Sequence, residues 1–193
     1  MSASIRKRHP VHAERRALLA LAAGSALLAA APARAASAAQ LASSSKAALD
    51  KLTAKVPAAR ALAKNAKAVL VFPKVTKAGL GVGGQFGEGA LIQGGKVVAY
   101  YNTAGASVGL QAGAQTFGYA LFFMNDNALA QLDKNDGFEV GVGPSVVVMD
   151  EGMAKSATTT TLRDDIYAFI FGQKGLMAGL GVQGNKITRI HPK

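Results

Sequence analysis

Basic side chains are concentrated between residues 46 and 77, where Asp50 is the only acid. The whole chain carries a formal net charge of +11, yet from residue 78 onward basic and acidic residues nearly balance. A one-sided basic segment favours a polyanionic partner, such as an anionic lipid surface, a nucleic acid or an acidic protein. The basic residues predicted to meet that partner are Lys46, Lys51, Lys55, Arg60, Lys64 and Lys67.

Helical periodicity places these basic residues beside a narrow apolar stripe. Residues 37–56 predict one helix, which Pro57 ends, and residues 58–67 predict a second, Ala-rich helix. The stripe of the first helix consists of Leu41, Leu49, Leu52 and Val56. Long cationic side chains that flank an apolar stripe are typical of a helix lying at a membrane surface.

This pattern predicts how the segment meets a membrane. We expect Leu49, Leu52 and Val56 to enter the lipid interface while the basic side chains contact anionic headgroups. The open alternative is that the stripe packs on a sheet and leaves the lysines in solvent. We expect no nucleic-acid partner, because no aromatic residue for base stacking occurs between residues 46 and 67.

The rest of the chain offers no constellation for catalysis. It has no Cys, and beyond the N-terminal segment its only His is His191. One His cannot form an ordinary zinc site, and no Gly-x-Ser-x-Gly elbow is present for nucleophilic catalysis. Adjacent Asp164 and Asp165 would point to opposite faces of a strand, which favours a turn over a catalytic pair. The sequence therefore predicts a non-enzymatic protein with no cofactor and no metal.

Two glycine patterns, at residues 79–84 and 179–184, match the Gly-x-Gly-x-x-Gly spacing of dinucleotide-binding loops. In those loops the glycines open a helix whose N-terminus meets the pyrophosphate. Here the glycines alternate with apolar residues, as they do inside strands, so strands are the favoured interpretation.

The N-terminal residues 1–35 are typical of a secretory signal peptide. A basic leader extends to Arg16, an apolar run covers residues 17–31, and Ala33-Arg34-Ala35 suits cleavage. The run is too short to span a bilayer, which needs about 20 apolar residues. We therefore expect an exported protein, in the periplasm or outside the cell, by either the Sec or the twin-arginine route.

The apolar period changes from helical to two after residue 67, which is typical of strands. The expected strands are 68–72, closed by Pro73, and 90–93, 96–101, 117–124, 138–142, 145–149, 166–171, 176–182 and 186–190. Gly94-Gly95 suits a hairpin turn, and Asn125 can cap a short helix. We expect an α+β fold: a β-rich antiparallel sandwich or partly closed barrel with N-terminal amphipathic helices. The basic segment 36–67 would form one domain with the core 68–193.

The aromatic residues also follow strand periodicity. Phe117, Tyr119 and Phe123 share one face, and Tyr167, Phe169 and Phe171 share another. We expect both sets to lie in an ordinary core, with the lining of an acyl-chain cavity as the alternative.

Several blocks of the core resemble the SYLF domain, in the order that this family shows. They are residues 67–79 (KAVLVFPKVTKAG), 83–89, 105–113, 123–126, 165–171 and 174–181. The resemblance covers most of residues 40–190 and implies a lipid-binding domain with an amphipathic N-terminal segment. The actin-linked relatives carry SH3 or FYVE modules that this chain lacks, so we do not expect actin binding to transfer.

Residues and resemblance together predict a non-enzymatic lipid-binding domain of the bacterial cell envelope, peripherally associated with an anionic phospholipid membrane. The alternative is a structural or scaffold protein of the envelope that acts by self-association as a homo-oligomer. Gly-rich strands with few charges favour this second reading, because their edges can pair with one another.

Overall fold

The computed structural model describes residues 36–133, 137–140, 145–149, 163–175 and 185–193. At residues 81, 107–112 and 175 it describes the backbone only. Residues 36–193 form one compact unit. The predicted signal peptide lies outside the described residues, as do the second glycine pattern and the strand expected at 176–182.

Two helices open the unit, as predicted. Helix α2 (Ala38–Lys55) begins at a capping box, in which the Ser37 side chain accepts from the Gln40 backbone and the Gln40 side chain accepts in return. Helix α3 (Pro57–Asn65) has its proline at the first helical position, where the missing N–H costs nothing. The two helices therefore start and stop where local sequence signals place them.

A single long hairpin, rather than several separate strands, forms the centre of the sheet. Strands β1 (Ala68–Gln93) and β2 (Lys96–Phe123) pair antiparallel from Ala68–Phe123 to Gln93–Lys96. The turn uses Gly94 and Gly95 at φ of 55° and 77°, a region that favours glycine. The expectation that Pro73 ends a strand was wrong, because this proline lies at a register shift where a missing N–H is tolerated.

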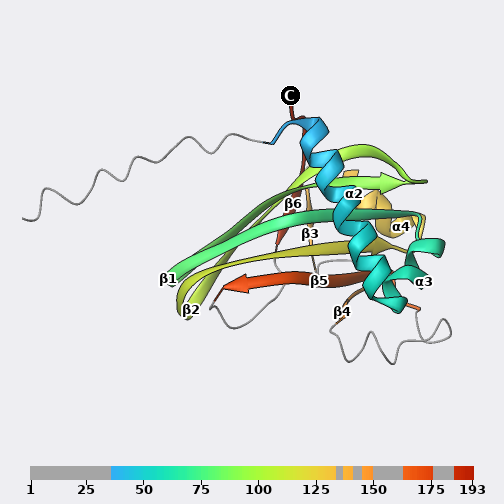
Figure 1. The fold of residues 1–193 in the computed structure, drawn as a ribbon. Coiled ribbons are helices and arrows are strands. Elements are labelled where there is room, and N and C mark those ends of the chain that lie inside the picture. The colour runs from blue at the N-terminus through green and yellow to red at the C-terminus, as the bar shows by residue number, and fades with distance from the viewer. Residues whose placement is uncertain (1–35, 134–136, 141–144, 150–162, 176–184) are drawn as a thin grey trace, which may run out of the picture. The chain divides into compact units, whose positions relative to one another are not determined.

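The hairpin bends sharply near its middle, and both strands turn and run back (Figure 1). The register shifts between Leu80 and Val82, which pair with Ala112 and Val108. A Cβ on Gly79 would collide with the backbone of Gly83, so the chain passes close to itself here and glycine is required. We call this bend the hairpin apex, meaning residues 78–86 of β1 and 104–114 of β2.

The remaining strands extend a 6-stranded sheet around β2. Strands β5 (Ile166–Gly175) and β6 (Lys186–Ile190) pair antiparallel with opposite halves of β2. Strand β3 (Phe138–Glu139) pairs with β6, and β4 (Val146–Met149) pairs with β5. The α+β class and the partly closed barrel are confirmed, but the sheet is mixed, because β4 runs parallel to β5.

Buried side chains form two clusters, one on each face of the sheet. The first includes Leu70, Phe72 and Tyr119, and it extends to Leu132 beside helix α4 (Asp126–Leu129) and the 3₁₀ turn η1 (Ala130–Asp133). The second joins helices α2 and α3 to the opposite face and includes Val71, Phe122 and Phe169. The predicted division of aromatics between two core faces is confirmed, with rings such as Phe72 and Tyr119 only 4.7 Å apart.

Candidate functional site

The apolar stripe of α2 packs on the sheet. Leu41 and Leu52 are 3% and 5% exposed, and Leu49 and Val56 are partly buried against the same cluster. Ser45, between them, is fully buried, and its hydroxyl donates to the Val71 carbonyl at 3.3 Å. In this arrangement Leu52 is a core residue. The entry of Leu49, Leu52 and Val56 into lipid stays a prediction that would require α2 to leave the sheet.

The six basic residues predicted to bind lipid are all exposed, but two have structural partners. Arg60 donates from Nε and Nη2 to the Thr53 and Ala54 carbonyls, both at 2.8 Å, and so caps the C-terminal end of α2. Lys67 Nζ lies 3.4 Å from Asp126 Oδ2 in an exposed ion pair. Arg60 and Lys67 therefore differ from Lys46, Lys51, Lys55 and Lys64 in that their charged groups already have partners within the protein.

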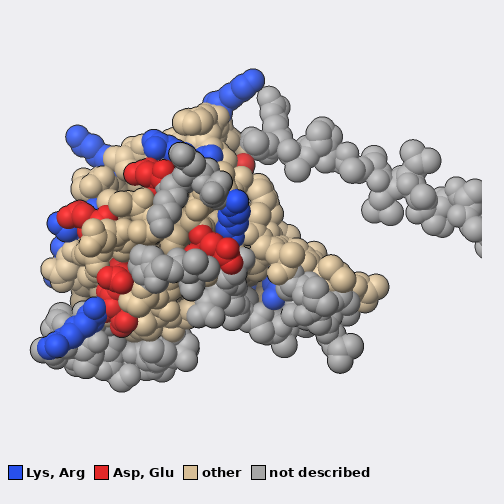
Figure 2. All heavy atoms as spheres, turned by 180° about the vertical axis from the view of Figure 1, so that it is seen from behind, with Lys and Arg blue, Asp and Glu red and all other residues tan. Residues whose placement is uncertain are grey.

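These four lysines form no ion pair with any described residue. On α2, Lys46 lies on one side of the buried stripe and Lys51 on the other, because 100° of rotation separates successive residues. On α3, Lys64 lies opposite the buried Leu62. We call these residues the helical lysines. On the opposite side of the molecule, by contrast, acidic and basic side chains are interspersed (Figure 2).

The acidic pair joins separate segments of the chain. The Asp165 carboxylate accepts from Asn125 Nδ2 at 2.6 Å and from the Ser145 backbone N–H at 3.1 Å. These hydrogen bonds stabilise the charged form and hold the pKa of Asp165 below its usual value. The Asp164 backbone N–H donates to the Tyr167 hydroxyl at 2.8 Å. The two aspartates therefore anchor the start of β5, in the turn that the sequence predicts.

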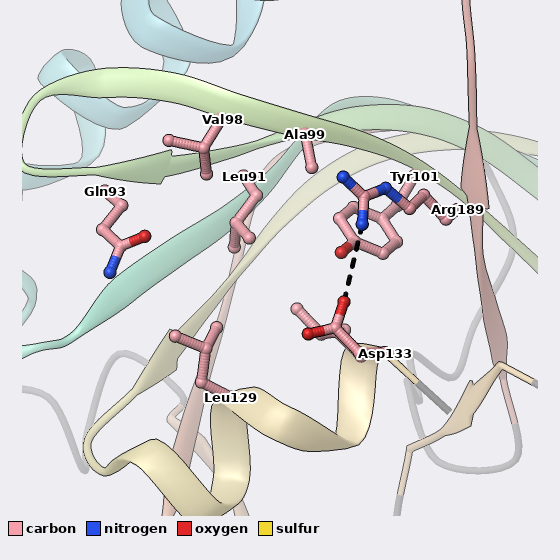
Figure 3. Close-up of a pocket in the computed structure, with 9 residues that line it drawn as sticks. Leu91, Gln93, Val98, Ala99, Tyr101, Leu129, Asp133 and Arg189 are labelled. Atoms are coloured by element: carbon pink, nitrogen blue, oxygen red, sulfur yellow. Dashed lines mark ion pairs between the residues drawn. The ribbon is translucent and has the colours of Figure 1, made fainter. Parts of the chain in front are cut away.

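A cavity of about 200 Å³ opens between the end of the β1–β2 hairpin and the α4–η1 segment (Figure 3). Leu91, Leu129 and Leu132 give it an apolar wall, and Arg189 forms an ion pair with Asp133 at 3.6 Å on its rim. Burial raises the pKa of the Tyr101 hydroxyl, against the opposing charge of Arg189. Because Asp133 balances Arg189, the lining carries no unpaired charge, and the cavity gathers none of the predicted lipid-binding residues.

The interior behind the hairpin apex is polar. The Tyr119 hydroxyl donates to Thr103 Oγ1 at 2.6 Å, and burial raises its pKa above the usual range. Gln115 and Asn185 are also buried, at 5% and 4% exposed. The Gln115 Oε1 and Asn185 Nδ2 atoms each have no hydrogen-bond partner among the described residues. A polar interior of this kind suits ordered water and does not suit an acyl chain.

The largest exposed apolar side chains lie at the hairpin apex, where the sequence analysis placed no site. Leu80 is 83% exposed, Val82 67% and Phe86 53%. A signal for this surface existed in the sequence: residues 78–87 and 97–125 contain no charged side chain at all. Exposed contiguous apolar surface marks interaction sites more often than exposed single residues do.

Two further features bear on the chemistry. The described residues contain no group of three His, Cys, Asp or Glu side chains that could hold a metal ion. Within the same ranges, no helix is long and apolar enough to cross a membrane. Gly79–Gly84 lies inside β1 and not at the start of a helix, so this glycine pattern does not form a dinucleotide-binding loop.

A comparison with known protein families gives a match over the C-terminal part of the chain. The family model Ysc84, described as "Las17-binding protein actin regulator", matches residues 104–191, from within β2 to just past the end of β6. No curated protein matches the chain. By its description the family is one of binding proteins. The resemblance to the SYLF domain seen in the sequence is thereby confirmed over residues 104–191.

Proposed function

We propose that this chain is a non-enzymatic domain of the bacterial cell envelope that attaches peripherally to anionic lipid membranes. The observation that supports this best is the set of helical lysines: four exposed cations without a described ion-pair partner, on helices held firmly to the sheet. A cation that forms no ion pair keeps most of its attraction for a lipid phosphate, although Asp50 on the same helix lies one turn from Lys46.

The size of this attraction is sufficient for reversible binding. Each Lys near an anionic membrane surface contributes about 1 kcal/mol, and the effect falls off within a Debye length of about 8 Å at physiological salt. Lys51 and Lys55 lie on one side of the buried stripe and Lys46 lies on the other. A flat membrane surface would therefore contact only some of these lysines at a time. Arg60 and Lys67 contribute less in this proposal, because their charges already have partners.

The proposed site is the cell envelope because residues 1–35 have the pattern of a cleaved export signal. Lipid headgroups rather than actin are the proposed partner, because an exported bacterial domain meets phospholipid and not a eukaryotic cytoskeleton. The description of the family as a binding protein supports a binding role of either kind.

The test uses residues 36–193, which form a compact unit and exclude the basic leader. Co-sedimentation is measured with neutral vesicles and with vesicles containing anionic phospholipid, at low and high salt. We expect binding to anionic vesicles only, and its loss at high salt. Lys51→Glu/Lys64→Glu should weaken binding at least about thirtyfold, from about 1 kcal/mol per Lys.

A matched variant, Lys96→Glu/Lys186→Glu, makes the same change in net charge on strands β2 and β6, outside the two helices. We expect it to bind nearly as well as the unchanged protein. Equal weakening by both variants would show that net charge alone, and not the helical surface, directs binding. Failure of the unchanged protein to bind either kind of vesicle would contradict the proposed function.

A further inference from the structure

The hairpin apex exposes apolar side chains on one continuous outer face. Alternate residues of β1 point outward there, from Ala78 through Leu80 and Val82 to Phe86, and all four are exposed. Across the pair, Ala104, Ala106 and Ala114 of β2 are exposed as well. This arrangement gives a ridge of aliphatic and aromatic groups with only small residues around them.

The backbone of the apex maintains this exposure. Gly79 and Gly83 approach so closely that no side chain fits between them, which fixes the bend and leaves Leu80 and Val82 at its outermost point. Their neighbours in β1 are glycines, which have no side chains to cover them. Apolar surface that is already exposed in the folded protein is available to enter an apolar phase without rearrangement of the fold.

Two exposed lysines lie behind this ridge, on the first half of β1 and on β5, while the half-buried Glu88 follows Phe86 by two residues on the second half of β1. Lys74 and Lys174 line an open cavity of about 400 Å³ together with Thr116 and Gly172. Both lysines are exposed and form no ion pair with a described residue. Lys74 precedes Leu80 by six residues on the same outward face, which is about 20 Å along a strand. An apolar tip with cations set back from it matches the depth order of a bilayer, in which acyl chains lie beneath the phosphates.

We propose that the hairpin apex enters the acyl region of an anionic bilayer through Leu80, Val82 and Phe86, while Lys74 and Lys174 contact headgroup phosphates. This inference rests on the proposed function and adds the part of the molecule that penetrates the lipid. A second copy of the chain fits the same surface less well. An identical apex offers no acidic side chain to the two lysines, because residues 78–87 and 97–125 are uncharged.

The absence of Trp from the chain allows a direct test. Leu80→Trp places a single indole at the apex, which is excited selectively over the four tyrosines of the chain. Val98→Trp places one at an exposed apolar position, 50% exposed, outside the apex. Residues 36–193 are used here as well, because the basic leader would itself attract anionic vesicles. Emission is recorded with and without vesicles of anionic phospholipid, and with vesicles whose acyl chains carry a bromine quencher.

We expect vesicles to move the emission of the Leu80→Trp variant to shorter wavelength and brominated chains to quench it, with little change for the Val98→Trp variant. Leu80→Asp/Val82→Asp should lower vesicle partition roughly tenfold or more, since each substitution removes an aliphatic side chain from the lipid. The far-UV spectrum and urea midpoint of this double variant should stay close to those of the unchanged protein, because both residues are exposed.

Each other outcome is decisive. Vesicle binding without a change in the emission of the Leu80→Trp variant overturns the inference and leaves the proposed function standing. A shift to shorter wavelength without lipid, growing with protein concentration, overturns it in favour of contact between copies at the apex. No vesicle binding by the unchanged protein overturns the proposed function and this inference together.

Discussion

The helical segment and the hairpin apex combine apolar and basic residues in opposite ways. On α2 and α3 the apolar side chains are buried against the sheet and the lysines face solvent. At the apex the apolar side chains face solvent, and the lysines lie behind them. The same residue types therefore suit electrostatic attachment in one region and penetration in the other. Amphipathic periodicity alone does not distinguish these two arrangements, because it leaves open which face is covered.

The largest expected effect separates a core leucine from a solvent-exposed one. Leu52→Ala should lower the free energy of unfolding by about 2–5 kcal/mol, since Leu52 is 5% exposed within a packed cluster. Leu80→Ala, at an 83% exposed position, should change it by no more than about 0.5 kcal/mol. Urea denaturation measures both. A stable Leu52→Ala protein with impaired vesicle binding would reverse the comparison and assign α2 to the lipid interface.

A second prediction concerns the bend that presents the apex. Gly79→Ala should destabilise the fold by about 1–3 kcal/mol, because the added methyl group meets the Gly83 backbone. Gly84→Ala is the matched control, because its added methyl group would lie 3.7 Å from the nearest atom, the Gly105 carbonyl oxygen. Thermal unfolding of the two variants gives the difference. Equal melting temperatures would mean that the close approach at Gly79 is not what holds the apex in place.

A third prediction divides the basic residues by role. Arg60→Gln should lower the free energy of unfolding by about 1 kcal/mol, because it removes the donors that cap α2. Lys64→Gln, one turn along the exposed side of α3, should leave stability unchanged and weaken binding to anionic vesicles. If the two variants lose vesicle binding equally, with no difference in stability, then capping is not the main role of Arg60.

The smallest expected effect lies outside both regions. The pKa of Asp165 is held below its ordinary value of 3.8 by hydrogen bonds from Asn125 and Ser145. Its stabilising contribution is therefore present above that value and is lost as the pH falls through the lower pKa of the folded protein. Asp165→Asn should reduce the dependence of stability on pH in the acid range. Chemical denaturation across the range in which carboxyl groups titrate, from about pH 2 to about pH 6, measures this effect, with vesicle binding as the control.

Local signals predict the elements of this fold better than their assembly. Pro57, the Gly94-Gly95 turn and the Asn125 cap act within a few residues, and the structure shows all three as expected. The parallel pairing of β4 with β5 depends on strands brought together by the whole chain. Short-range patterns do not encode such pairing.

The candidate site shows the same division. Exposure of the six basic residues follows from helical periodicity, but the partners of Arg60 and Lys67 depend on where each helix ends and where α4 lies. Alternation at Leu80 and Val82 correctly indicates a strand, and it cannot reveal that the strand turns back and leaves this face uncovered. Solvent exposure is a property of the assembled sheet rather than of a sequence window.

The two ends of the described unit meet. The Ala38 backbone N–H donates to the Lys193 carbonyl at 3.1 Å, which joins the first turn of α2 to the short tail that follows β6. Any segment fused before residue 36 therefore leaves the domain beside any segment fused after residue 193. Such a geometry suits insertion into a loop of a host protein, and it suits circular permutation, in which a short linker joins the present ends and new ends open at Gly94-Gly95.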